Sequence, residues 1–261
     1  MTRTEPRFAP GTFLPNPEAA RPTAMLAAQT RMELTLLLRN GEQLLLTMFI
    51  PIALLVGFAV LPIGGDATRI DSLVPAVMAV AVMSTAFTGQ AIAVGFDRRY
   101  GALKRLGATP LPRWGVIGGK TLAVVIVVIL QAVILGGIGL ALRWRPEPVG
   151  LALWVPILAL GVFAFASLGL LLGGTLKAEV VLALANLLWF VMGAIASLVV
   201  VREHVPDAVL VLARLSPSGA LTEALTRATT LGAVDWFGLA VLAAWGVVGS
   251  ALAVRLFRFT D

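Results

Sequence analysis

The sequence contains no cysteine and only one histidine, His204. Without cysteine, the chain has no disulfide framework, no thiolate metal site and no cysteine nucleophile. A single histidine beside Glu203 cannot form the histidine pair of a metal site. We therefore expect this chain to hold no metal and to carry no catalytic residues.

Charged residues are also scarce. They make up 13% of the 261 residues, against about 25% in soluble domains, whereas 59% are hydrophobic and the mean hydropathy is +0.94. This composition predicts an all-α integral membrane protein. The net charge of +6 does not indicate nucleic acid as a partner, because the basic residues stand at the ends of apolar segments and leave no basic face for phosphates.

Six apolar segments approach or exceed the roughly 20 residues that cross a bilayer. None has Asp, Glu, Lys, Arg or His well inside it. Ion- and proton-coupled carriers use such residues as relays, so the sequence disfavours a secondary carrier. The predicted spans cover residues 44–61, 73–96, 116–142, 151–176, 180–201 and 236–257.

The first 43 residues precede the spans. Residues 1–22 are rich in proline and are predicted to be a disordered cytoplasmic tail. Residues 23–43 place leucines on one helical face and Arg31 and Arg39 on the opposite face. This pattern predicts an interfacial helix on the membrane surface, with both arginines at the membrane interface. A helix packed on the cytoplasmic side of the protein itself is the alternative.

Residues 202–234 connect the last two spans. They include the apolar stretch Leu210-Val211-Leu212, but Pro206 and Pro217 interrupt them, and the pieces between are too short to span. We expect two short re-entrant helices that enter the outer leaflet part-way, shielded by protein. An ordinary surface loop is the alternative.

The distribution of basic residues predicts the orientation. With the N-terminus inside, the cytoplasmic segments hold fourteen of the 20 Lys and Arg residues and the outer loops hold six. The positive-inside rule therefore favours cytoplasmic N- and C-termini. Because the chain is expected to cross the membrane several times, we place it in the cell membrane.

The most basic segment, residues 96–120, separates the second and third spans and holds six Lys and Arg residues. Gly101 and Thr109-Pro110 confine a short helix to about residues 97–106. Leu103 and Leu106 give this helix an apolar side for a partner's groove. Positive-inside topology alone is the alternative explanation of the charge.

Gly118-Gly119-Lys120-Thr121 looks like the end of a phosphate-binding loop. That motif requires a glycine six residues before the lysine, where this chain has Trp114. The chain is therefore not expected to bind ATP there. We interpret Lys120 as an interfacial anchor at the start of the third span and Trp144 as an interfacial aromatic residue at its end.

Gln90, Gln131 and Asn186 are the amide side chains within the spans. Each needs a hydrogen-bonding partner or a wet cavity in the membrane. They are candidates to line a translocation path. The alternative is that they join helices by hydrogen bonds.

Residues 96–111, FDRRYGALKRLGATPL, resemble the cytoplasmic segment of type 2 ABC exporter permeases of the daunorubicin-resistance and antibiotic-export group. The six-span plan, the N-terminal amphipathic helix and the broken outer segment resemble that family over about residues 25–258. The resemblance implies that residues 97–115 form a coupling segment that docks on a separate ATP-binding subunit. Carried over by position, its contact residues are Asp97, Arg98, Arg99, Gly101, Leu103, Lys104 and Arg105.

Arg99 stands where the family usually has Glu, so the surface that pairs with the ATPase is expected to differ. The resemblance further implies two ATP-binding subunits, which hold ATP and Mg, and a second permease chain, identical or different. This chain itself would bind no cofactor. The implied function is export of an amphiphilic drug, antibiotic or lipid-like substrate; a membrane scaffold or binding protein without transport is the alternative.

Overall fold

The computed structural model describes residues 20–41, 45–60 and 68–257, and these ranges contain helices and no strands. Within these described ranges, five helical segments are long and apolar enough to cross a membrane, and they match the second to sixth predicted spans. The prediction of an all-α integral membrane protein is confirmed. The five segments are Ile70–Arg99, Trp114–Ala141, Pro148–Thr175, Ala178–Val200 and Trp236–Leu256.

The first predicted span is helical at every position that the structure describes. It consists of α3 (Ile50–Val60) and the preceding π-helical turn η1 (Leu45–Phe49), and its apolar helical stretch is Thr47–Val60. Residues 44 and 61 lie outside the described ranges, as do residues 1–19 of the predicted tail. This apolar stretch is shorter than the five segments above, and its role as the first span stays a prediction.

The second span is one continuous rod made of three pieces. These are α4 (Thr68–Val82), the π-helical segment η2 (Met83–Gly89) and α5 (Gln90–Arg99). A π-helical turn inserts an extra residue and so rotates the side chains that follow it. Ser84 and Thr85, inside η2, make polar contacts with α9 (Ala178–Val200) and α7 (Arg113–Ala141) respectively.

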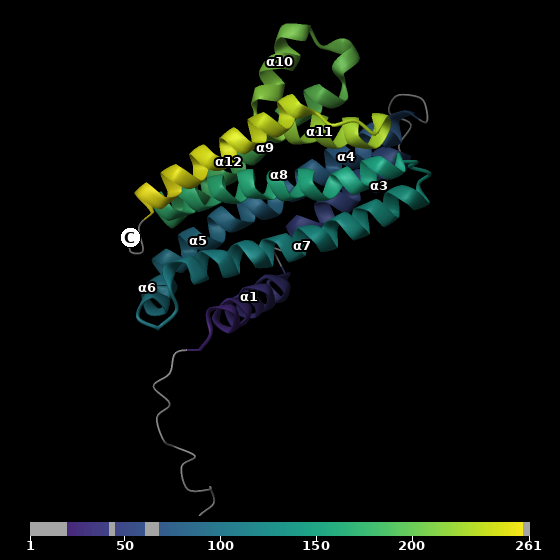
Figure 1. Cartoon of the computed structure of the whole chain (residues 1–261). Helices are drawn as coiled ribbons and strands as arrows, with labels where there is room; N and C mark the ends of the chain where they lie inside the picture. The colour runs from purple at the N-terminus through teal and green to yellow at the C-terminus, as the bar shows by residue number, and fades with distance from the viewer. Residues whose placement is uncertain (1–19, 42–44, 61–67, 258–261) are drawn as a thin grey trace, which may run out of the picture.

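Helix α8 (Pro148–Thr175) lies at the centre of the bundle, between α5 and α12 (Trp236–Leu256) (Figure 1). Its glycines allow close contact with the second span. A Cβ on Gly169 would lie 2.8 Å from the Phe87 carbonyl oxygen, and one on Gly173 would lie 3.1 Å from the Ala91 carbonyl carbon. Small residues at such crossings let helix backbones approach each other.

Two short helices, α10 (Asp207–Leu215) and α11 (Pro217–Leu231), meet at an angle of 104° between the last two spans. Helix α11 runs along one half of α8. Its end packs on Gly150, near the start of α8, and Leu221 reaches Gly161, near the middle of α8. The two expected helices are therefore present, and their entry into the outer leaflet stays a prediction.

Asp235 fixes this bent pair to the start of α12. Its buried carboxylate lies 2.8 Å from the Arg214 guanidinium of α10 and 3.4 Å from that of Arg227 in α11. The indole of Trp245 in α12 also donates to the Leu215 carbonyl at the end of α10, at 2.9 Å. One carboxylate thus joins three helices.

Helix α6 (Ala102–Gly107) and the end of α12 lie at the same end of the bundle, and α1 (Pro22–Arg39) runs beside α7 near that end (Figure 1). This arrangement agrees with the expectation that the basic segment and the C-terminal end share one side. Orientation relative to a membrane stays a prediction.

Candidate functional site

The candidate site is the corner where α5 ends, α6 follows and α7 begins. Gly101 separates α5 from α6 and has a φ of 68°, a left-handed conformation that favours glycine. After α6, the Thr109 hydroxyl donates to the Leu106 carbonyl at 2.6 Å. Pro112 then precedes the first residue of α7, where its missing N–H costs no helical hydrogen bond. Glycine and proline therefore set the ends of α6. The predicted helix over residues 97–106 is wrong in its bounds, because the left-handed turn at Gly101 divides that range: residues 97–99 end α5, and α6 covers only Ala102–Gly107.

Replacing Gly101 by alanine is expected to lower the free energy of unfolding by about 1–2 kcal/mol, because a side chain is disfavoured at positive φ. Thermal unfolding of the purified chain in detergent measures this effect. Gly107→Ala is the matched control, since Gly107 lies within α6 without positive φ and a Cβ there meets nothing within 4 Å. Equal losses in both variants would contradict the conformational explanation.

Leu103 fastens α6 to the bundle. It is 2% exposed and packs in a cluster with Val94 of α5, Val116 of α7, Leu170 of α8 and Ala253 of α12. The predicted apolar side of the short helix therefore faces the chain's own helices. Leu103 supports the position of α6 from inside the protein.

Arg98 is likewise an internal residue. It is 4% exposed, and its guanidinium donates to the carbonyls of Gly173 at 3.0 Å and Leu176 at 2.9 Å. These carbonyls belong to the C-terminal end of α8, where backbone acceptors lack helical partners and a positive charge is favourable. Arg98 thus holds the end of α5 against the end of α8.

Arg99 pairs within the chain with Glu179, in the first turn of α9. Its guanidinium also lies about 6 Å from the rings of Phe96 and Tyr100. The Arg99 side chain therefore links the end of α5 to the start of α9. Because both charged side chains are largely exposed, the pair contributes little stability.

Lys120 lies inside a buried ion cluster, not on a lipid-facing surface. Its ammonium is 2.6 Å from the Asp97 carboxylate at the end of α5 and 2.9 Å from the Glu33 carboxylate of α1. Gln29 donates to the second Glu33 oxygen at 2.7 Å. Sequence reasoning missed Glu33 and Gln29, because polar residues on an amphipathic helix are usually assigned to its solvated face.

Helix α1 packs mainly against α7, which agrees with the alternative to a helix lying free on the membrane surface. Its inward face carries the buried Gln29 and Glu33, whereas Leu36 and Leu38 are exposed. Arg31 and Arg39 are exposed as well, and their place at a membrane interface stays a prediction. Helix α1 therefore directs polar side chains toward the bundle and exposes some of its leucines.

Lys104 and Arg105 are the exposed cations of α6. Two aromatic residues flank them, Tyr100 with 66% exposure and Trp114 with 52%. Arginine and aromatic residues are enriched in protein interfaces. Of the seven predicted contact residues, Arg99, Lys104 and Arg105 are exposed and Gly101 shapes the turn, whereas Asp97, Arg98 and Leu103 make contacts within the chain.

The structure does not bring the three predicted path residues together. Gln131 is 1% exposed, and its amide donates to the Thr85 hydroxyl at 2.9 Å and to the Thr47 carbonyl at 2.7 Å. It thus joins α7 to η2 and η1. Asn186 lies on the exposed side of α9 and bonds to Leu182 of its own helix.

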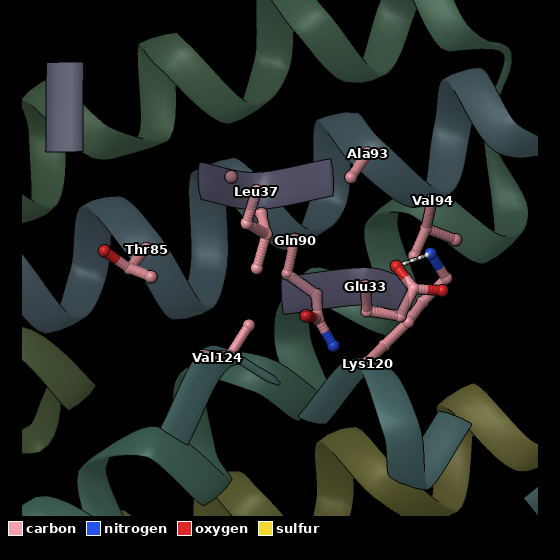
Figure 2. A pocket seen from close by; sticks show the side chains of 9 residues that line it. Glu33, Leu37, Thr85, Gln90, Ala93, Val94, Lys120 and Val124 are labelled. Carbon is pink, nitrogen blue, oxygen red and sulfur yellow. Dashed lines mark hydrogen bonds and ion pairs between the residues drawn. The ribbon is translucent and has the colours of Figure 1, made fainter. Parts of the chain in front are cut away.

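Gln90 lines a small cavity of about 20 Å³ together with Glu33, Thr85 and Lys120 (Figure 2). That volume is enough for about one water molecule. Figure 2 shows the ion pair of Glu33 and Lys120 beside the Gln90 amide. The cavity is too small to form a substrate passage in this conformation.

Trp144, predicted as an interfacial residue, is 2% exposed and lies against Trp154 of α8 with ring centroids 5.3 Å apart. The chain turns back after α7, and the backbone N–H of Trp144 donates to the Gly139 carbonyl at 2.9 Å. This turn directs the indole into the bundle. Trp144 therefore packs the end of α7 against α8.

These features define a multi-pass membrane protein whose helices carry a short, rigidly held basic helix at one end. The chain matches the family described as "ABC-2 family transporter protein" over residues 66–255. It belongs to that family. No curated protein matches it.

Membership makes this chain the membrane component of an ABC transporter and not itself an enzyme. Such permeases generally associate with an ATP-binding subunit. The matched region includes the corner of α5, α6 and α7 but begins after α1.

Proposed function

We propose that the chain is the permease subunit of an ATP-driven exporter, and that the corner of α5, α6 and α7 is where it engages a separate ATP-binding subunit. The observation that carries this proposal is that some residues of the corner are exposed while others are buried in the bundle. Lys104 and Arg105 face outward, whereas Leu103 and Arg98 anchor the same segment inside the bundle. A surface fixed in this way can both bind a partner and transmit its movement.

The path of that movement begins in the second span. Residues 70–99 form one helical segment, so a displacement at Arg99 would move the whole second span. Arg98 bonds to the end of α8 and Arg99 pairs with α9. Closure of an ATPase dimer at α6 would thus move three spans and exchange inward- and outward-facing forms of a pair of permease chains.

The proposed substrate is amphiphilic. Helix α9 exposes apolar side chains beside the Asn186 amide, a surface that suits a molecule with an apolar body and one polar group. We propose that α9 faces the path between two permease chains. The buried Gln90 and Gln131 would support this path from inside the bundle. The exposed apolar residues of α9 include Val180, Leu182, Leu187, Phe190 and Val191.

The proposal predicts that the chain, purified from its own cells in mild detergent, retains a protein with a phosphate-binding loop and ATPase activity. The double substitution Lys104→Glu/Arg105→Glu is expected to lower the retained ATPase at least tenfold, because charge reversal at an interface opposes docking. ATP-driven uptake of an amphiphilic fluorescent dye into inverted vesicles should fall by the same factor. Both quantities are normalised to the amount of inserted permease.

Arg145→Glu is the matched control, because Arg145 is an exposed cation between α7 and α8, remote from the corner. It should leave ATPase retention unchanged. A purified chain that never retains an ATPase would refute the exporter and favour the non-transporting scaffold. Full retention by the double variant would refute the docking role of α6.

A further inference from the structure

Gly118 and Gly119 form a seat for α1 on α7. A Cβ on Gly119 would lie 2.9 Å from the Gln29 Cβ and 3.2 Å from the Thr30 backbone nitrogen, and one on Gly118 would lie 3.2 Å from Leu26. Glycine at these positions therefore lets α1 approach the α7 backbone closely. The motif that resembles part of a phosphate-binding loop has a role in helix packing.

Lys120, the next residue, adds a charged link to this seat. Its single ammonium bonds to carboxylates on two other helices, Glu33 on α1 and Asp97 on α5. Gln29 holds the Glu33 carboxylate from its other side. Figure 2 shows Glu33 and Lys120 pointing toward each other from α1 and α7.

Burial shields one half of this link from solvent. Glu33 and Lys120 are each 7% exposed, so water and salt compete weakly for their charges. The Asp97 side chain is 33% exposed, and its carboxylate lies 2.6 Å from the Lys120 ammonium. Asp97 lies only four residues before Gly101, the turn into α6. Packing on the glycine seat alone would hold α1 to α7, whereas Lys120 also connects α1 to the last turn of α5.

We propose that Lys120 is a positioning residue that holds α1 in a fixed place relative to the corner of α5 and α6, so that both move as one body. The proposal rests on the proposed function only for the source of the movement, an ATP-binding subunit docked at α6. In this proposal, α1 transmits movement together with α6. The Glu33–Lys120–Asp97 cluster makes α1 follow a displacement of α6.

The absence of native cysteine allows a direct test by paired spin labels. One label is attached at Thr35→Cys on the exposed side of α1 and the other at Ala108→Cys, exposed just after α6. Pulsed dipolar spectroscopy on the full chain in lipid nanodiscs should give one narrow distance distribution. Glu33→Gln and Asp97→Asn should each broaden it at least twofold, because each breaks one half of the link.

Lys120→Arg should keep the narrow distribution, since a guanidinium can also bridge two carboxylates. Lys177→Met, at an exposed lysine outside the cluster, is the control and should also keep it. No broadening in either carboxylate variant would overturn the proposal. Broadening in Glu33→Gln alone would overturn it too, because α1 would then be held by α7 without Asp97.

These measurements need no ATPase partner, so they separate this proposal from failure of the proposed function. A second measurement leaves the cluster intact and uses labelled chain that retains its ATP-binding subunit. On ATP binding, the distance between residues 35 and 108 should stay constant, while the distance from each to a label at Val247→Cys on α12 changes. A change in the distance between 35 and 108 on ATP binding would overturn the proposal whether or not the carboxylate variants fold.

Discussion

Replacing Lys120 by methionine is expected to lower the free energy of unfolding by about 3–5 kcal/mol, because removing one partner of a buried ion pair leaves uncompensated charge. Glu33 would lose its countercharge within the buried part of the cluster, and Asp97 would lose a bond of 2.6 Å. Denaturant titration of the purified chain in mixed micelles, followed by tryptophan fluorescence, measures the loss. A change below about 1 kcal/mol, the range of a solvent-exposed ion pair, would contradict the cluster.

The same cluster predicts recovery when all its charges are removed. Adding Glu33→Gln and Asp97→Asn to Lys120→Met should restore most of the lost stability, because a neutral set of residues needs no countercharge. Lys177→Met serves as the single-substitution control at an exposed lysine. Additive losses in the triple variant would show that the three residues act independently.

Replacing Gly150 by valine is expected to lower the free energy of unfolding by about 3 kcal/mol, the upper part of the usual range for overpacking. A Cβ at this position would lie 2.7 Å from the Ala228 carbonyl carbon and 2.9 Å from the Thr229 Cα. Both atoms are backbone, so α8 and α11 must separate. The Trp154 indole, which donates to the Leu225 carbonyl of α11 at 3.4 Å, should report the separation as a change in fluorescence.

Gly136→Val is the control for the intrinsic cost of valine in a helix. A Cβ on Gly136, in α7, meets nothing within 4 Å. This variant should lose less than about 1 kcal/mol. If Gly150→Val were no worse than Gly136→Val, the close packing of α11 on α8 would be refuted.

The elements of this fold could be predicted from the sequence where one local signal decides them. Apolar length predicted the second to sixth spans, and Gly101 with Thr109-Pro110 predicted a short helix between two of them. The predicted bounds of that helix, residues 97–106, are wrong, because α5 continues to Arg99 and α6 begins only at Ala102. The π-helical segments η1 and η2 have no comparable local signal in the sequence.

The contacts of the site could not be predicted in the same way, because they join distant residues. Glu33 and Lys120 are separated by 87 positions, and no periodicity pairs them. Trp144 and Lys120 have the composition of interfacial residues, yet tertiary packing buries both. The outward direction of Lys104 and Arg105 likewise follows from Leu103, whose partners come from four different helices.

The way α11 is enclosed has a consequence for the order of biosynthesis. Its buried polar residues include Thr222 and Glu223, and it contacts α4, α8 and α9, which are made before it, and α12, which is made after it. The packing contacts of α11 are therefore complete only after α12 has been synthesised and inserted. We expect the final packing of α11 to follow that step, and a chain truncated before α12 would lack part of the surface on which α11 packs.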